Sequence, residues 1–111
     1  MGVVTHLRRF DLYLVNLDPT QGSEIKKIRP CIIISPDDMN RHLRTTIIAP
    51  MTSKIRQYPT RVFLEFNGKE GQIALDQLRT VDQERLIKKL GTISKESQAT
   101  ILHILHEIFS E

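Results

Sequence analysis

The strongest structural signal in the chain is Arg29-Pro30-Cys31-Ile32-Ile33-Ile34, followed at once by Ser35-Pro36-Asp37-Asp38. The continuous apolar residues 31–34 predict a strand buried on both faces, with Cys31 in the core. Pro30 favours an extended conformation for the arginine before it. The next four residues predict the start of a short helix capped by Ser35. Proline suits the first helical position, and carboxylates suit the positive end of the helix dipole.

Further strands are expected on both sides of this run. Residues 11–17 are apolar and end at the turn signal Asp18-Pro19, after which residues 20–28 are expected to form a loop. A strand over 45–49 is expected to end at Pro50, and Asn67-Gly68 predicts a turn between two strands. The remaining segments are strands at 60–66, 71–76 and 87–93, a polar, basic loop over 51–59 and a capped helical turn at 82–86.

The C-terminal part of the chain predicts one amphipathic helix, from Ser94 as its cap to about Phe109. The expected apolar face consists of Ile101, Leu102, Leu105, Ile108 and Phe109, widened by Ile104. About six short strands and this helix predict a mainly β fold, a small and partly closed barrel. A length of 111 residues predicts one domain over 1–111.

Composition excludes several classes of protein. An apolar fraction of 40% and a charged fraction of 26% are ordinary for a globular protein and exclude a disordered tail. A single cysteine excludes an intramolecular disulfide framework and a multi-cysteine zinc site. The sequence has no apolar run long enough for a membrane helix and no apolar segment typical of a signal peptide, so a cytoplasmic location is expected.

Positive charge gathers in the middle of the sequence. Residues 26–61 contain eight Lys and Arg against two Asp, hence a net charge of +6, whereas the whole chain carries +3. Such a segment favours a surface that binds a polyanion, although solubilising surface charges would give the same pattern.

Standard catalytic signatures are absent from the sequence. It has no glycine-rich phosphate loop, no His-Glu-x-x-His and no Gly-x-Ser-x-Gly. His103 and His106 have a spacing that could chelate a metal, but no third ligand stands near them in the sequence. We therefore expect neither a metal nor a cofactor.

Three polar positions allow a structural and a functional interpretation. Arg29 either offers its guanidinium to a phosphate or pairs with Glu24 across the loop. Thr52 and the serine after it either bind phosphate or make local turn hydrogen bonds. Asp76 is either a base or the salt-bridge partner of Arg79.

Taken in order, several of these segments resemble the MazF/PemK toxin family. The resemblance covers about residues 9–109. It is carried by Asp11-Leu12-Tyr13-Leu14-Val15-Asn16-Leu17-Asp18-Pro19-Thr20-Gln21-Gly22-Ser23-Glu24, then Arg29-Pro30, Ala49-Pro50-Met51-Thr52-Ser53 and Asp76-Gln77-Leu78-Arg79-Thr80-Val81-Asp82.

The resemblance implies a toxin of a toxin–antitoxin pair. Such toxins are metal-independent, sequence-specific endoribonucleases (mRNA interferases) that cleave single-stranded mRNA through the 2′-hydroxyl, and so arrest translation and growth. Their fold is an SH3-like, CcdB/PemK-type β-barrel. They form homodimers, and a MazE-like antitoxin covers the RNA groove in a complex that also binds DNA.

Carried over by motif, the catalytic arginine falls on Arg29 and the catalytic threonine on Thr52. Glu24 and Asp76 are the candidate bases of the two family branches. Ala74 stands where the PemK-like branch has an arginine, so the sequence resembles the MazF-like branch more closely. The expected RNA-binding residues are Lys26, Lys27, Ser53, Lys54, Arg56 and Gln77.

Two other functions stay open at this point. A CcdB-like protein that poisons a protein target such as DNA gyrase would share the fold, but would need no basic groove. A barrel that binds nucleic acid without cleaving it would keep the charge and tolerate the loss of Thr52. The basic middle segment favours the ribonuclease over the gyrase poison.

Overall fold

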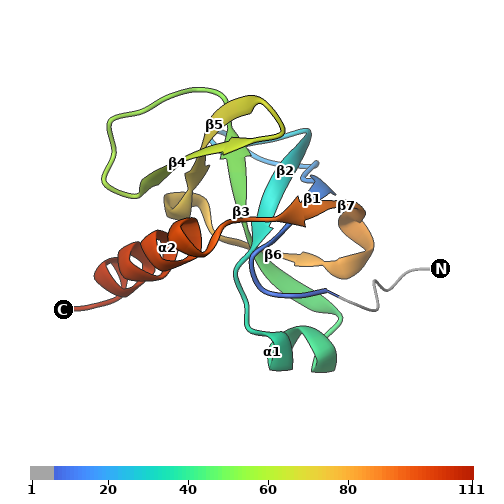
Figure 1. Ribbon diagram of the computed structural model, residues 1–111. Helices are drawn as coiled ribbons and strands as arrows, with labels where there is room; N and C mark the ends of the chain where they lie inside the picture. Colours follow the sequence, from blue (N-terminus) through green and yellow to red (C-terminus); the bar gives the residue numbers. More distant parts are fainter. Residues whose placement is uncertain (1–6) are drawn as a thin grey trace.

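Seven strands and two α-helices follow one another along residues 7–111, the part of the chain that the computed structural model describes (Figure 1). In order these are β1 (Asp11–Asn16), β2 (Ile28–Ile33), α1 (Asp37–His42), β3 (Thr45–Thr52), β4 (Arg61–Phe66), β5 (Lys69–Ala74), β6 (Arg79–Asp82), β7 (Leu86–Thr92) and α2 (Lys95–Ile108). Single 3₁₀ turns occupy Leu75–Gln77 and Gln83–Arg85. The expectation of a missing export signal rests partly on residues 1–6, which lie outside this description.

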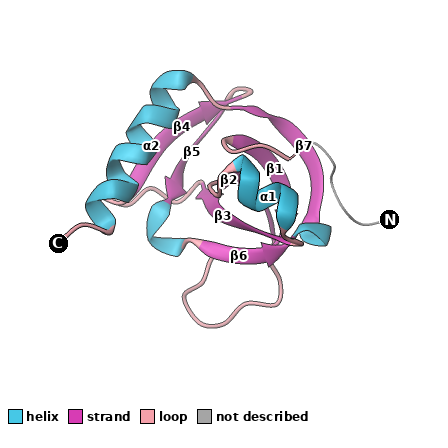
Figure 2. Ribbon diagram, turned by 90° about the horizontal axis from the view of Figure 1, so that it is seen from below, coloured by secondary structure: helices cyan, strands magenta, loops and turns pink. Residues whose placement is uncertain are grey.

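The strands form one curled antiparallel sheet. Its order is β4-β5-β3-β2-β1-β7, and β6 also pairs with β3. β3 pairs with β6 through its first half and with β5 through Met51 and Thr52, so it belongs to both parts of the sheet. Seen end on, the strands curve into a half-barrel with α2 along one side (Figure 2). This architecture confirms the predicted mainly β barrel with a C-terminal helix.

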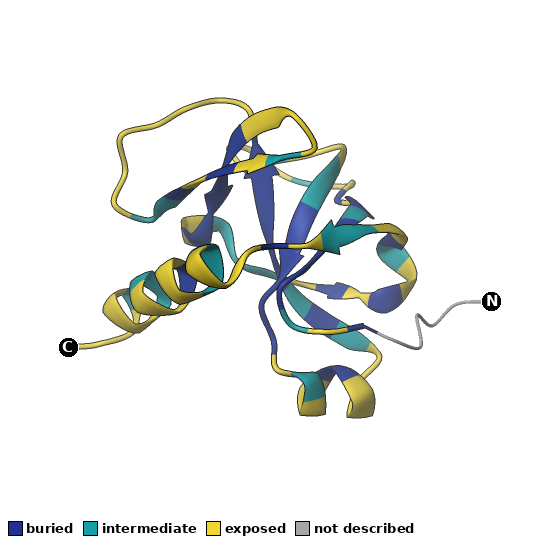
Figure 3. Cartoon of the chain, in the orientation of Figure 1, coloured by how far each residue is buried: buried dark blue, intermediate teal, exposed yellow. Residues whose placement is uncertain are grey.

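Both faces of the central strands are buried, as the apolar run predicted (Figure 3). Leu12, Ile32 and Ala49 pack on the face that α2 covers, together with Ile101 of the helix. Cys31 and Ile48 pack on the opposite face, in a second cluster. The two-residue period of each strand separates the clusters, because successive side chains point to opposite faces.

The prediction that Pro50 ends a strand is wrong, because β3 continues through it to Thr52. Pro50 lies opposite Cys31 of β2, and it falls between the residues of β3 that pair with β6 and those that pair with β5. On the edge of β3 that faces away from β2, the partner strand changes from β6 to β5 at this point. The N–H that proline lacks is therefore missing where that change of partner occurs. β6, which was not predicted, is a four-residue strand that tertiary pairing with β3 stabilises.

Two turns follow the sequence predictions closely, and one loop differs slightly. Asn67 and Gly68 both have positive φ, at 52° and 79°, and close the hairpin of β4 and β5. The carboxylate of Asp82 accepts a 2.9 Å hydrogen bond from the N–H of Glu84, which confirms the capped turn there. The loop predicted over 20–28 is shorter at its end, because β2 begins at Ile28.

The helix predictions need two corrections. Pro36, not Ser35, is the N-cap of α1. The Ser35 hydroxyl instead donates to Asn40 Oδ1 at 2.6 Å and accepts from the N–H of Ile47 at 3.0 Å. In α2, Ser94 is the cap as predicted. The helix packs with Ile101, Ile104, Leu105 and Ile108, whereas Leu102 is 41% and Phe109 73% exposed.

Candidate active site

Arg29 and Thr52 come to facing positions where β2 and β3 separate. The last paired residues are Cys31 and Pro50, in antiparallel register. Two residues further along each strand are Arg29 and Thr52. The period of two places both on the face of Cys31. Beyond this point Thr52 pairs with Gln72 of β5 instead. Arg29 and Thr52 therefore occupy corresponding positions of β2 and β3, just beyond the last pair of the two strands.

Arg29 keeps most of its guanidinium available. The side chain is half-buried, and Nε donates a 2.9 Å hydrogen bond to the carbonyl of Lys26. The alternative that paired Arg29 with Glu24 is wrong. The Glu24 carboxylate accepts from the N–H of Gln21 at 3.0 Å. One bond thus orients the Arg29 fork, and its two terminal nitrogens make no hydrogen bond or ion pair within residues 7–111.

Thr52 is held in place by its neighbours on both sides. It is 7% exposed, and its Oγ1 accepts a 3.1 Å hydrogen bond from the N–H of Lys54, the local turn bond that the sequence allowed. Gly71 of β5 lies against it, and an added Cβ there would be 2.7 Å from the Thr52 carbonyl oxygen. The hydroxyl hydrogen of Thr52 remains available to donate.

Gln72 fixes the loop that follows Thr52, a role that sequence reasoning missed. Its Oε1 accepts from the N–H of Arg56 and its Nε2 donates to the Arg56 carbonyl, each at 3.0 Å. The signal in the sequence was a polar residue between Gly71 and the apolar residues Ile73 and Ala74. The loop itself, residues 53–60, carries the expected RNA-binding residues Ser53, Lys54 and Arg56, all of which are exposed.

Asp76 is bound by Arg61, so the predicted pairing with Arg79 is wrong. Arg61 donates to both carboxylate oxygens, at 2.8 and 3.2 Å, and the Thr60 hydroxyl donates at 2.9 Å. These bonds, the one from Arg61 first, hold the pKa of Asp76 below its ordinary value, although partial burial acts in the other direction. A carboxylate with a lowered pKa is a weak proton acceptor.

Gln77 attaches the other loop of the site, residues 17–27. Its Oε1 accepts a 2.8 Å hydrogen bond from the N–H of Ile25, 52 residues earlier in the chain. The loop carries Glu24, Lys26 and Lys27, all exposed. Gln77 therefore positions the loop through its oxygen and keeps its amide N–H groups for another partner.

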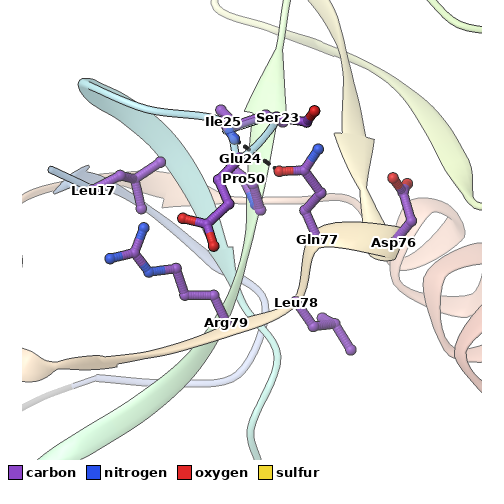
Figure 4. Close-up of a pocket in the computed structure, with 9 residues that line it drawn as sticks. All are labelled: Leu17, Ser23, Glu24, Ile25, Pro50, Asp76, Gln77, Leu78 and Arg79. Carbon is purple, nitrogen blue, oxygen red and sulfur yellow. Dashed lines mark hydrogen bonds between the residues drawn. The ribbon is translucent and has the colours of Figure 1, made fainter. Parts of the chain in front are cut away.

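Two cavities lie around these residues. One, of about 410 Å³, is lined by Glu24, Pro50, Gln77 and Arg79 among others, and Figure 4 shows Glu24 and Arg79 directed into it. The other, of about 460 Å³, contains Arg29 and Ser53 beside apolar side chains such as those of Met51 and Phe66. The candidate residues therefore divide between two cavities.

Cys31 lies beneath the site and is unreactive. It is fully buried, and burial raises the pKa of the thiol to about 12 even though Arg79 and Arg29 act to lower it. Within residues 7–111, no three His, Cys, Asp or Glu side chains gather where they could hold a metal ion. His103 faces Glu107 on the surface of α2 at 3.9 Å. None of the described helices is long and apolar enough to cross a membrane.

Comparison with known proteins identifies the family and the fold. Residues 8–109 match the family described as PemK-like, MazF-like toxins of type II toxin–antitoxin systems. The endoribonuclease MazF of Staphylococcus saprophyticus is 39% identical over 101 residues, which cover 86% of this chain and 84% of that protein. The crystal structure of MazF from Deinococcus radiodurans superimposes with a TM-score of 0.81 at 25% identity, over 92% of this chain and 94% of that one.

A second solved structure shares the fold at lower identity. It is described as an endoribonuclease in complex with its cognate antitoxin from Mycobacterial species. The TM-score is 0.78 at 21% identity, over 92% of this chain and 93% of that one.

Proposed function

This chain belongs to the PemK-like, MazF-like toxins of type II toxin–antitoxin systems, and we propose that Arg29 and Thr52 form its catalytic centre. The chain is an endoribonuclease of that family. The single observation that carries the catalytic proposal is the facing position of the two residues, with the Arg29 fork oriented by one hydrogen bond and the Thr52 hydroxyl free to donate.

The proposed reaction is cleavage of single-stranded RNA by its own 2′-hydroxyl. The 2′-oxygen loses its proton to a base and attacks the adjacent phosphorus. The bond from phosphorus to the 5′-oxygen breaks, and the 5′-oxygen takes up a proton. The products are a 2′,3′-cyclic phosphate and a 5′-hydroxyl. Because the RNA supplies the nucleophile, the reaction requires no metal from the protein.

In this reaction Arg29 stabilises the charge that develops on the phosphorane, and Thr52 donates a hydrogen bond to a non-bridging oxygen. Both are preorganised donors, and the loss of such a donor typically costs about 10²–10³ in rate. The guanidinium suits this task because its planar fork matches two phosphate oxygens.

Glu24 is the base that this arrangement favours over Asp76. The carboxylate of Glu24 lines the 410 Å³ cavity and one of its oxygens accepts only a backbone N–H. Asp76 is occupied by Arg61 and Thr60, and its lowered pKa makes it a poorer proton acceptor.

The exposed residues of the two loops would bind the RNA strand. Lys26, Lys27, Lys54 and Arg56 supply positive charge for phosphates, and Ser53 supplies a hydroxyl. Gln77 would contact a base through its amide N–H groups, since its oxygen is taken by Ile25.

The proposed assembly of the chain rests on its membership of the family. We propose that the chain acts as a single domain, forms a homodimer in the cytoplasm and is neutralised by a MazE-like antitoxin. An antitoxin accompanies the related endoribonuclease of known structure. Release of the toxin would then arrest translation and growth.

Primer extension tests the proposal. A long RNA without stable structure is incubated with the protein in EDTA, beside the Arg29→Ala variant. Cuts at one short recurring sequence that disappear in the variant support a metal-independent ribonuclease centred on Arg29. A folded parent protein that makes no cuts would contradict the proposal and favour a gyrase poison or a non-catalytic binding barrel.

A further inference from the structure

Arg79 has a buried guanidinium donor with no partner. Within residues 7–111, its Nη1 is inaccessible to solvent and makes no hydrogen bond, and the side chain forms none of the ion pairs found there. The residue lines the 410 Å³ cavity, with its guanidinium directed inward (Figure 4). A buried donor without a partner costs free energy in the free protein.

The sheet register places Arg79 on the same face as Arg29. Arg79 of β6 is directly opposite Ile48 of β3, and Ile48 is opposite Ile33 of β2. Alternate residues of a strand lie on one face, so Ile33, Cys31 and Arg29 of β2 share a face. Both guanidiniums are close enough to Cys31 to act on the pKa of its thiol. The two arginines thus approach one patch of the sheet from its two sides.

The positive charge of this patch has no internal counter-ion within the described residues. Neither Arg29 nor Arg79 forms an ion pair, and Glu24 shares the cavity with Arg79 without pairing to it. Two guanidiniums without a counter-ion leave their positive charge uncompensated, which costs free energy in the free protein. An anion that both arginines bind would remove this cost, and a phosphate offers the geometry that a guanidinium fork prefers.

We propose that Arg79 is a second catalytic arginine, which binds a non-bridging oxygen of the scissile phosphate from the side opposite Arg29. It stabilises the negative charge of the phosphorane, while Glu24 in the same cavity takes the 2′-hydroxyl proton. This inference rests on the proposed function, because it presupposes RNA cleavage at Arg29 and Thr52.

The test uses a short RNA that contains the cleavage sequence mapped by primer extension. Single-turnover rate constants are measured for the parent, Arg79→Met and Arg79→Lys, with Arg44→Met as the matched control. Arg44 is an exposed arginine beyond the opposite end of β3 from Thr52. We expect Arg79→Met to slow cleavage about 10²–10³-fold at an unchanged cleavage sequence, Arg79→Lys to recover part of the loss, and Arg44→Met to match the parent.

Sulfur substitution at the scissile phosphate separates a catalytic contact from a structural one. Each phosphorothioate diastereomer is assayed with the parent and with Arg79→Met. Where sulfur replaces the oxygen that Arg79 binds, the parent is slowed and the variant is slowed much less, because its contact is already lost. Thermal unfolding of each variant shows whether it is folded. If Arg79→Met does not fold, the same comparison is made with Arg79→Lys.

Other outcomes overturn the inference. A changed cleavage sequence would mean that Arg79 reads a base. Weaker RNA binding with an unchanged rate constant and a smaller salt dependence would place its contact at a remote phosphate. Unchanged kinetics would mean that Arg79 has a structural role. If the parent itself makes no cuts, the proposed function fails and the inference fails with it, whereas the other outcomes leave the proposed function intact.

Discussion

At the scale of single residues, the site depends on which hydrogen-bonding atoms of each side chain are already bound to neighbouring residues. Arg29 uses Nε alone and Thr52 uses only an acceptor lone pair, so both keep donors for a phosphate. Asp76 already accepts three hydrogen bonds from Arg61 and Thr60. Residue type alone does not separate these cases, because an arginine or an aspartate is equally suited to structure and to catalysis.

The Thr52→Val variant isolates one hydroxyl at nearly constant volume. We expect cleavage to fall by about 10²–10³, because a donor to the phosphorane is lost. Stability should fall by only about 1 kcal/mol through the lost bond from the Lys54 N–H. Single-turnover cleavage and urea unfolding measure the two effects. A rate within a few-fold of the parent would exclude a catalytic role for Thr52.

The Asp76 carboxylate should make stability depend on pH. Its pKa lies below the ordinary value of 3.8, mainly through the bond from Arg61, so the folded state favours the charged form. The stabilisation is therefore present above pH 3.8 and is lost as pH falls through the folded-state pKa. Asp76→Asn should be less stable than the parent at neutral pH, and the difference should shrink in acid.

Urea unfolding at neutral pH and well below pH 3.8 measures this difference. Asp38→Asn is the control, because Asp38 is exposed on α1 and pairs only with Arg41 one turn away. A constant difference between parent and Asp76→Asn at both pH values would show that the ion pair with Arg61 contributes nothing to stability.

At the scale of elements, two long-range glutamine contacts shape the site. Gln72 holds the loop 53–60 through the backbone of Arg56, and Gln77 holds the loop 17–27 through Ile25. Each glutamine belongs to a rigid part of the fold and each loop carries cations. The barrel thus helps to position both loops, together with bonds inside the loops such as that from the Gln21 N–H to Glu24.

Gln72→Met should loosen the loop 53–60 without changing the barrel. Two hydrogen bonds to Arg56 are lost, so we expect the Arg56 amide to exchange faster with solvent and cleavage to slow. Gln57→Met, at an exposed position of the same loop, is the matched control and should change neither. Hydrogen exchange at Arg56 that matches the parent would contradict the anchoring role.

The buried face of α2 differs from the one that periodicity predicted, and adjacent residues test it. Ile101 is fully buried and its truncation to alanine should cost about 2–5 kcal/mol. Leu102 is 41% exposed, so Leu102→Ala should change stability by no more than about 0.5 kcal/mol. Urea unfolding compares them, and equal losses would show that Leu102 is also packed.

At the scale of the whole molecule, the barrel leaves large apolar side chains on the surface. Ile28, Phe63 and Phe109 are each more than half exposed. A homodimer interface would remove some of this apolar surface from water. We expect the chain to sediment as a dimer at micromolar concentration. A monomer under those conditions would contradict the proposed homodimer.

Local sequence was sufficient for most elements of this protein and for the family that it belongs to. The apolar run 31–34, the Asn67-Gly68 turn and the Ser94 cap act through residues next to each other, so their effect is visible without the fold. The ordered motifs also predicted one site with Arg29 and Thr52, which the cleavage experiments test.

Only the tertiary structure decided which groups pair. The continuation of β3 through Pro50, the formation of β6, the capture of Asp76 by Arg61 and the unpaired donor of Arg79 all depend on residues far apart in the chain. Hydrogen bonds and ion pairs act over a few ångströms, and strand pairing sets those distances. Which side chains keep free hydrogen-bond donors, and which are already bound, is therefore decided only in the folded structure.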